Sequence, residues 1–163
     1  GSFQGNKYSP GRFKVSGMKE GRRIAFDYGS VRIGVGLSDY SGIIATPLKF
    51  LVNGENTFEE IKKLLENENP IYVVVGIPKH LSGTPGTKES EVMVFISKLK
   101  NITELPIYGI DERLSTVNAA AKLREIGRDS KSAKELIDSA AAVGILEVAM
   151  EHERAGGLDK CAL

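Results

Sequence analysis

Acidic side chains of the kind that can bind divalent metal ions occur at three places in the sequence. Asp27 ends the segment RRIAFD, Asp111 and Glu112 end PIYGIDE, and Asp138 lies within the apolar stretch LIDSAAAVGILEVAM. Carboxylate oxygens are the ligands that suit Mg²⁺ and Mn²⁺. Two such ions about 4 Å apart can activate a water molecule and stabilise a departing oxygen in phosphodiester hydrolysis. The acidic positions therefore suggest metal-dependent hydrolysis, provided that the fold brings them together.

Asp27 also has a purely structural interpretation. The segments 22–28 and 31–38 are typical of two antiparallel strands joined by a tight turn, and an aspartate at such a turn can hold the hairpin as an Asx-turn. The second strand favours a functional role, because Gly34 and Gly36 leave one of its faces nearly bare. Such a face permits the close approach of a helix or a ligand.

Asp111 and Glu112 lie where a predicted strand ends and a helix begins. Open α/β sheets bind their ligands at the carboxyl ends of parallel strands. Alternatively, one acid caps the following helix and the other pairs with Arg113 at the surface. Because side chains alternate along a strand, we expect only one of the two acids on the side of Asp27, and the sequence leaves open which one.

Asp138 is unusual because its surroundings are apolar. The pattern predicts a long helix from about Ser132 to Arg154, apolar on almost every side and therefore mostly buried. In such a helix Asp138 lies about two turns from the start, beyond the reach of the helix dipole. A buried carboxylate needs a cation, a metal or a proton. A partner such as Arg113, or a position at the edge of the buried surface, is the alternative.

A mixed α/β sheet is expected to position these acids. Strand–helix–strand spacing implies parallel crossovers, and the order βββαβαβαα predicts a five-stranded sheet with helices on both faces. An antiparallel three-strand meander precedes two parallel strands. The expected elements are strands at 22–28, 31–38, from Ile43, at 71–78 and from Pro106, and helices at 57–69, 88–99, 115–127 and 132–154.

Length and composition limit the classes of protein that are possible. The 163 residues are enough for one domain, which we expect over 18–157, after a leader or flexible arm at 1–17 and before a C-terminal tail at 158–163. A net charge of +1 neither favours nor excludes nucleic acid. The single Cys161 supports no disulfide framework, which fits a cytoplasmic protein. No apolar run approaches the roughly 18 residues of a membrane helix, so we expect no membrane partner.

Four segments together resemble a known family. They are RIAFDYGSVRIGVGLSD, VVVGIPKHLSGTPG, IDERLSTVNA and IDSAAAVGILE, and in this order and spacing they resemble the characteristic blocks of the YqgF/RuvX family. That family is related to the RuvC Holliday-junction resolvases, and the resemblance covers Arg22 to Glu151. It implies a ribonuclease H-like fold and a nuclease, acting either on the 5′ end of pre-16S ribosomal RNA in ribosome biogenesis or on Holliday junctions in DNA.

The resemblance also implies roles for the acids. Asp27, Glu112 and Asp138 would be the catalytic residues and the ligands of Mg²⁺ or Mn²⁺, with Asp111 as the alternative to Glu112. The resolvases carry a glutamate at the strand end where this chain has Gly76 to Pro78. A site of three carboxylates is expected to hold a second ion weakly, or only with a substrate phosphate as an additional ligand.

Eight polar side chains are candidates for contact with nucleic acid, although each could equally belong to a solvated loop, and Ser115 could instead cap a helix. They are Lys79, His80, Ser82, Arg113, Ser115, Thr116, Arg124 and Arg128. No aromatic stacking pattern accompanies them, so we expect recognition through backbone and shape. The expected partners are structured RNA, branched DNA or a ribosomal precursor particle. We expect a monomer or a weak dimer, although a resolvase that cuts two strands symmetrically needs a two-fold dimer.

Two other functions stay open at this point. The segment DYGS also fits the phosphate-binding turn of actin-like ATPases, whose two lobes close over a nucleotide, but this chain is long enough for only one lobe. The absence of a fourth carboxylate favours a different alternative, a non-catalytic module that binds nucleic acid or ribosomes.

Overall fold

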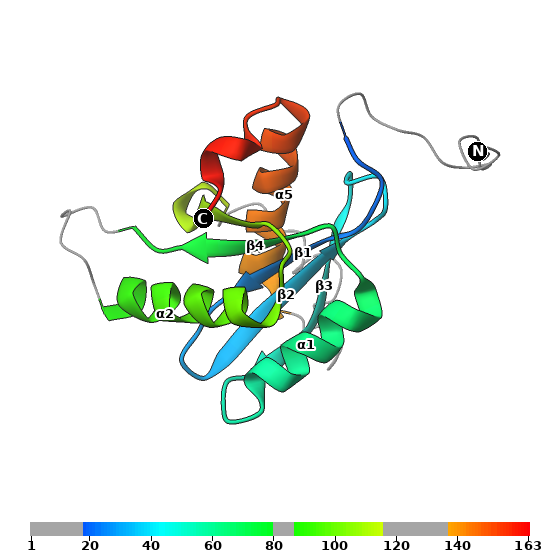
Figure 1. Cartoon of the computed structure of the whole chain (residues 1–163). Coiled ribbons are helices and arrows are strands. Elements are labelled where there is room, and N and C mark those ends of the chain that lie inside the picture. The colour runs from blue at the N-terminus through cyan, green and yellow to red at the C-terminus, as the bar shows by residue number, and fades with distance from the viewer. Residues whose placement is uncertain (1–17, 80–86, 116–136) are drawn as a thin grey trace.

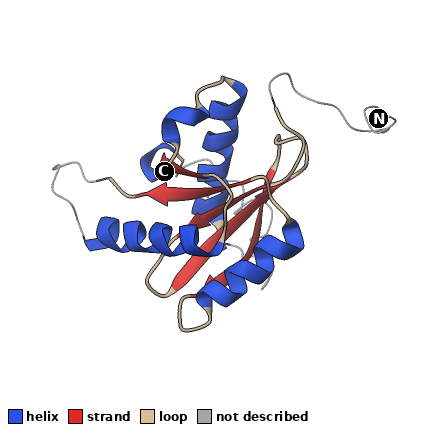
Figure 2. Cartoon of the chain, viewed as in Figure 1, coloured by secondary structure: helices blue, strands red, loops and turns tan. Residues whose placement is uncertain are grey.

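The structure is a computed structural model that describes residues 18–79, 87–115 and 137–163. The strands are β1 (Arg23–Asp27), β2 (Arg32–Ser38), β3 (Ala45–Val52), β4 (Tyr72–Ile77) and β5 (Ile107–Asp111). The helices are α1 (Thr57–Glu68), α2 (Thr87–Ile102) and α5 (Ala140–Arg154), with short 3₁₀ helices η2 (Glu112–Leu114) and η3 (Leu158–Cys161). Figures 1 and 2 show their arrangement around one sheet.

The sheet has five strands in the order β3-β2-β1-β4-β5. β1, β2 and β3 form an antiparallel meander, and β4 and β5 run parallel to β1. α1 and α2 cover one face, while α5 crosses the other and contacts all five strands (Figure 1). The predicted mixed sheet with helices on both faces is confirmed. The carboxyl ends of β1, β4 and β5 consequently lie at one edge of the molecule.

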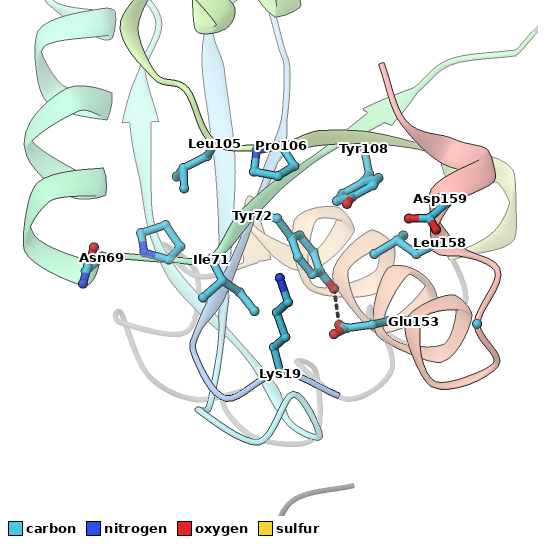
Figure 3. A pocket seen from close by; sticks show the side chains of 12 residues that line it. Lys19, Asn69, Ile71, Tyr72, Leu105, Pro106, Tyr108, Glu153, Leu158 and Asp159 are labelled. Atoms are coloured by element: carbon cyan, nitrogen blue, oxygen red, sulfur yellow. Dashed lines mark hydrogen bonds between the residues drawn. The ribbon is translucent and has the colours of Figure 1, made fainter. Parts of the chain in front are cut away.

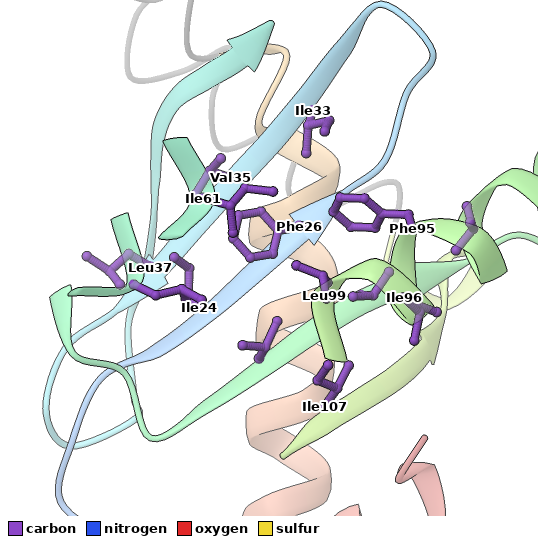
Figure 4. Close-up of a cluster of buried hydrophobic side chains, with 14 residues drawn as sticks. Ile24, Phe26, Ile33, Val35, Leu37, Ile61, Phe95, Ile96, Leu99 and Ile107 are labelled. Carbon is purple, nitrogen blue, oxygen red and sulfur yellow. The ribbon is translucent and has the colours of Figure 1, made fainter. Parts of the chain in front are cut away.

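Alternation along β1 decides which face each side chain joins. Ile24 and Phe26 belong to the buried cluster under α1 and α2 (Figure 4), whereas Ala25 belongs to the cluster under α5. The Phe26 ring meets the Phe95 ring of α2 edge to face, with centroids 6.2 Å apart. Asp27 therefore follows Ala25 onto the α5 face, as the alternation predicts.

A helix packs on the bare face of β2, which is one of the two possibilities that the sequence leaves open. A Cβ atom added to Gly36 would lie 3.1 Å from backbone atoms of Ala142 in α5. The missing side chain thus lets the axis of α5 come close to the sheet. Among the described residues, no helix combines the length and the apolar character needed to cross a membrane.

The prediction of a continuous helix around Asp138 is wrong. α5 begins only at Ala140, and Asp138 and Ser139 form a turn before it. The physical reason is tertiary, because the Ser139 hydroxyl is hydrogen-bonded to the backbone of two strands. Asp138 is therefore partly exposed at the start of the helix and not two turns inside it. Residues 132–136 lie outside the described part.

Ser115 ends the short helix η2 and lies where the sequence predicts the start of another helix. It is the last residue of the turn formed by η2, and its hydroxyl donates to the backbone oxygen of Glu112 at 3.1 Å. The remainder of the helix predicted at 115–127 lies outside the described residues. Further along the chain, Leu158 of η3 is buried, and the Leu163 N–H donates to the Ile107 oxygen of β5.

Candidate metal centre

Asp27 lies between two glycines at the end of β1. It is paired with Gly34 of β2, and Gly76 of β4 lies on its other side because Phe26 is paired with Val75. The two glycines place no side chain beside the carboxylate on the α5 face. The strand neighbours therefore leave room for a second acid.

Glu112 supplies that second acid from the end of β5. One of its carboxylate oxygens, Oε2, lies 3.5 Å from where a Cβ of Gly76 would be, so Glu112 covers the glycine next to Asp27. Alternation explains this position, because Ile110 also faces α5. The two acids come from strands separated by β4 and meet over it.

Asp111 points into a different environment. It accepts hydrogen bonds from the Arg113 backbone N–H at 3.0 Å and from Arg113 Nη2 at 2.6 Å. These hydrogen bonds hold the pKa of Asp111 below its usual range. The structure therefore brings Glu112 beside Asp27, whereas the carboxylate of Asp111 is bound by Arg113.

The environment makes ionisation of Asp27 costly. Burial and, to a smaller extent, the negative charge of Glu112 raise the pKa of Asp27 to about 6, and the positive charge of Lys88 opposes this rise. A buried carboxylate with a raised pKa, next to a second carboxylate, forms a site that a bound cation would stabilise. Their donor atoms are all oxygens, and these residues fit Mg²⁺ or Mn²⁺ in donor type.

The backbone of Asp138 lies at the same edge of the sheet as Asp27 and Glu112. A Cβ on Gly34 would lie 2.4 Å from the Asp138 carbonyl oxygen, so Asp138 lies directly over the residue paired with Asp27. Its carboxylate, however, pairs with Arg32 Nη1 at 3.5 Å, and not with the Arg113 considered from the sequence. Among the residues that the structure describes, no three or more His, Cys, Asp or Glu form a group able to hold a metal. Asp27 and Glu112 form a pair, and Asp138 lies nearby with its own partner.

Lys88, a basic residue at the start of the helix that follows β4, also belongs to this site. It is the second residue of α2, and its Nζ lies 3.9 Å from Glu112 Oε1. Its place in the chain indicates this position, because α2 follows the loop at the carboxyl end of β4. The start of α2 therefore lies at the same edge as Asp27 and Glu112.

Three of the eight candidate nucleic-acid contacts lie in the described part of the chain. Lys79 is exposed just beyond β4, and Arg113 is exposed but held by Asp111. Ser115 is buried, and its hydroxyl is bonded to the Glu112 backbone. The others lie outside the described residues: His80, Ser82, Thr116, Arg124 and Arg128.

A pocket of about 600 Å³ lies at the opposite edge of the sheet, where β4 and β5 begin (Figure 3). The Tyr72 hydroxyl donates to Glu153 there at 2.7 Å, and Glu153 is also paired with the fully buried Arg23 at 2.8 Å. Burial and the hydrogen bond to Glu153 raise the pKa of Tyr72 above its usual range. Because Arg23 and Tyr72 already engage Glu153, this carboxylate is less suited to bind a metal ion than the Asp27–Glu112 pair.

Gly34 should tolerate no side chain. Gly34→Ala would place its Cβ 2.4 Å from the Asp138 oxygen and 3.0 Å from the Ser139 Cα, and both atoms belong to the backbone. We expect the substitution to lower the free energy of unfolding by about 1–3 kcal/mol. The control is Gly54→Ala, where nothing lies within 4 Å. Equal thermal stability of the two variants would contradict the close approach seen here.

Comparison with known proteins agrees with the geometry. The family model described as "RuvX: Holliday junction resolvase" matches residues 21–152. Relatives from Streptomyces avermitilis and Streptomyces coelicolor, both named "Putative pre-16S rRNA nuclease", are each 42% identical to this chain. Each alignment covers 86% of this chain, with 92% of the first relative and 86% of the second.

A solved structure shares the fold. "T. thermophilus RuvC in complex with Holliday junction substrate" matches with a TM-score of 0.57 and 17% identity, over 87% of this chain and 99% of that chain. This similarity concerns the fold, which is ribonuclease H-like. The family match covers most of the sequence and two relatives are 42% identical, so the chain belongs to the RuvX family.

Proposed function

We propose that this protein is a divalent-metal-dependent nuclease that cleaves a phosphodiester bond in the 5′ region of pre-16S ribosomal RNA, in the cytoplasm. The observation that carries the proposal is the Asp27–Glu112 pair at the carboxyl ends of β1 and β5, where burial and like charge favour a bound cation. The names of the relatives support the substrate. A ribosomal precursor particle would be the natural form of that substrate.

The proposed roles follow from the positions of the side chains. Asp27 and Glu112 would hold Mg²⁺ or Mn²⁺, and Asp138 would be the third ligand in place of its pairing with Arg32. The bound ion would supply activation of water and stabilisation of the departing oxygen. Lys88, next to Glu112, would approach the substrate phosphate and offset its negative charge.

The direct test compares two substrates under the same conditions. Purified protein is incubated with Mn²⁺ and either a pre-16S RNA fragment or a four-way DNA junction, and the products are mapped. We expect cleavage of the RNA at a defined position. Binding without cleavage of either substrate would instead favour the non-catalytic module. The family description supports a second candidate, junction resolution, which predicts paired cuts in the DNA and a dimer.

The titration of Asp27 provides a test that requires no activity. In metal-free protein, we expect the Asp27 carboxyl signal in NMR to titrate near pH 6. Glu112→Gln removes a negative charge and should lower the pKa of Asp27, whereas Lys88→Gln removes a positive charge and should raise it. Titration near the ordinary aspartate value of about 4 in all three proteins would refute the proposed coupling.

A further inference from the structure

Ser139 is a polar side chain enclosed between two strands and a helix. It is 0% exposed, and its hydroxyl accepts a hydrogen bond from the Val35 N–H of β2 at 3.0 Å. The same hydroxyl donates to the Leu48 oxygen of β3 at 2.6 Å. One side chain from the start of α5 therefore joins two neighbouring strands.

These hydrogen bonds lie at an irregularity of the sheet. The β2–β3 register shifts between Ile33, paired with Leu51, and Val35, paired with Leu48. A bulge leaves backbone groups without their regular ladder partners, and buried backbone groups must find others. A hydroxyl can satisfy an N–H and a carbonyl oxygen at once, because it both accepts and donates.

The position of this contact relates it to the acids. Ser139 directly follows Asp138, and Val35 directly follows Gly34, the residue paired with Asp27. The backbone of Asp138 also lies against Gly34, where a Cβ would be 2.4 Å from the Asp138 oxygen. The Ser139 hydroxyl thus fixes the chain to β2, one residue after Asp138. The strand β2 lies next to β1, which carries Asp27.

We propose that Ser139 is a positioning residue, which holds Asp138 at the edge of the sheet where it can join Asp27 and Glu112 around a metal ion. This inference rests on the proposed function. The hydroxyl would reduce the motion of the Asp138 backbone. The Asp138 carboxylate could still leave Arg32 and bind the metal ion instead. The competing interpretation is that the hydroxyl only stabilises the bulge.

The test measures Mn²⁺ affinity of the full chain by calorimetry, without any substrate. We expect Ser139→Ala to weaken Mn²⁺ binding about 10- to 100-fold, as loss of groups that orient metal ligands commonly does. Ser139→Thr keeps a hydroxyl and should bind Mn²⁺ more tightly than Ser139→Val, which has nearly the same size and no hydroxyl. This matched pair separates the hydrogen bonds from the volume of the side chain.

A double-mutant cycle tests whether Ser139 affects Mn²⁺ affinity through Asp138. In an Asp138→Asn background, Ser139→Ala should cause little further loss of Mn²⁺ affinity, because the ligand that it positions is already gone. An equal loss in both backgrounds would overturn the inference. So would Mn²⁺ affinity that stays at the wild-type value in Ser139→Ala while its melting temperature falls. If Ser139→Ala does not fold, Ser139→Cys, with a weak donor, takes its place in the cycle.

Failure of the metal site itself has a different signature. Asp27→Asn should abolish Mn²⁺ binding, and unchanged affinity in that variant would refute the proposed function. Loss of affinity in Asp27→Asn, combined with wild-type affinity in Ser139→Ala, would refute only the role of Ser139.

Discussion

Asp27→Asn is expected to lower the rate of metal-dependent RNA cleavage by at least about 100-fold, because a bound metal supplies several kcal/mol of transition-state stabilisation. RNA binding should change little, since in the proposed function the phosphate contacts would come from basic side chains such as Lys79 and Lys88. The measurements are single-turnover cleavage in Mn²⁺ and RNA affinity in Ca²⁺. Cleavage at the wild-type rate in this variant would show that the reaction uses another site.

The matched control for this substitution is Asp111→Asn. Asp111 is also an aspartate at a strand end of the same edge, but its carboxylate is held by Arg113 at 2.6 Å. We therefore expect the control to cleave RNA at a rate close to wild type. Equal losses in both variants would mean that a general change of charge, and not metal binding by Asp27, explains the result.

The pH dependence of stability distinguishes loss of chemistry from loss of structure. The pKa of Asp27 is raised from 3.8 to about 6 in the folded protein, so its carboxyl contributes stability at low pH that is lost as the pH rises from about 4 to about 6. At pH 7.5 the ionised carboxylate costs on the order of 3 kcal/mol without metal. Asp27→Asn removes this cost, so the variant should be no less stable than wild type although it is inactive.

Glu153→Ala is expected to cause a large loss of stability, at the other edge of the molecule. It would leave the guanidinium of Arg23, which is 0% exposed, without the carboxylate that accepts from both its Nε and its Nη2. Breaking a buried ion pair from one side costs about 3–5 kcal/mol. For a chain of this length that corresponds to a fall in melting temperature of roughly 6–20 °C.

A neighbouring ion pair supplies the control. Arg22 pairs with Glu68 at 2.8 Å, and both side chains are partly exposed. Glu68→Ala should cost at most about 1 kcal/mol, because exposed ion pairs contribute little. Thermal unfolding measures both variants, and equal losses would contradict the buried character of the Arg23 pair. Because Glu153 lies far from the acids, RNA cleavage per folded molecule should be unchanged at a temperature where both variants are folded.

The sequence predicts most of the fold and part of the site. Alternation of side chains along β1 is enough to place Asp27 on the face opposite Phe26. Asp111 and Glu112 are candidates because open α/β sheets bind ligands at the carboxyl ends of their strands. Glycines at alternate positions of β2 indicated the close approach of a helix or a ligand, and the structure shows the helix α5 there. These features depend on local patterns and on the order of the elements, which a sequence records directly.

The remaining features depend on contacts between distant residues. The apolar pattern continues through Asp138 and Ser139, and only the hydrogen bonds from Ser139 to Val35 and Leu48 explain why α5 starts later. The ion pair of Asp138 with Arg32 likewise joins segments more than 100 residues apart. Local periodicity contains no information about such partners.

A crystal grown with Mn²⁺ tests the central claim most directly. The Asp27–Glu112 pair predicts an anomalous difference peak between these two carboxylates, with their oxygens about 2.1 Å from the ion, as for octahedral ions of this kind. The same map shows whether Asp138 leaves Arg32 to join them. Absence of a peak at Asp27 and Glu112 at saturating Mn²⁺, or a peak held by Asp111 in their place, would contradict the proposed metal centre.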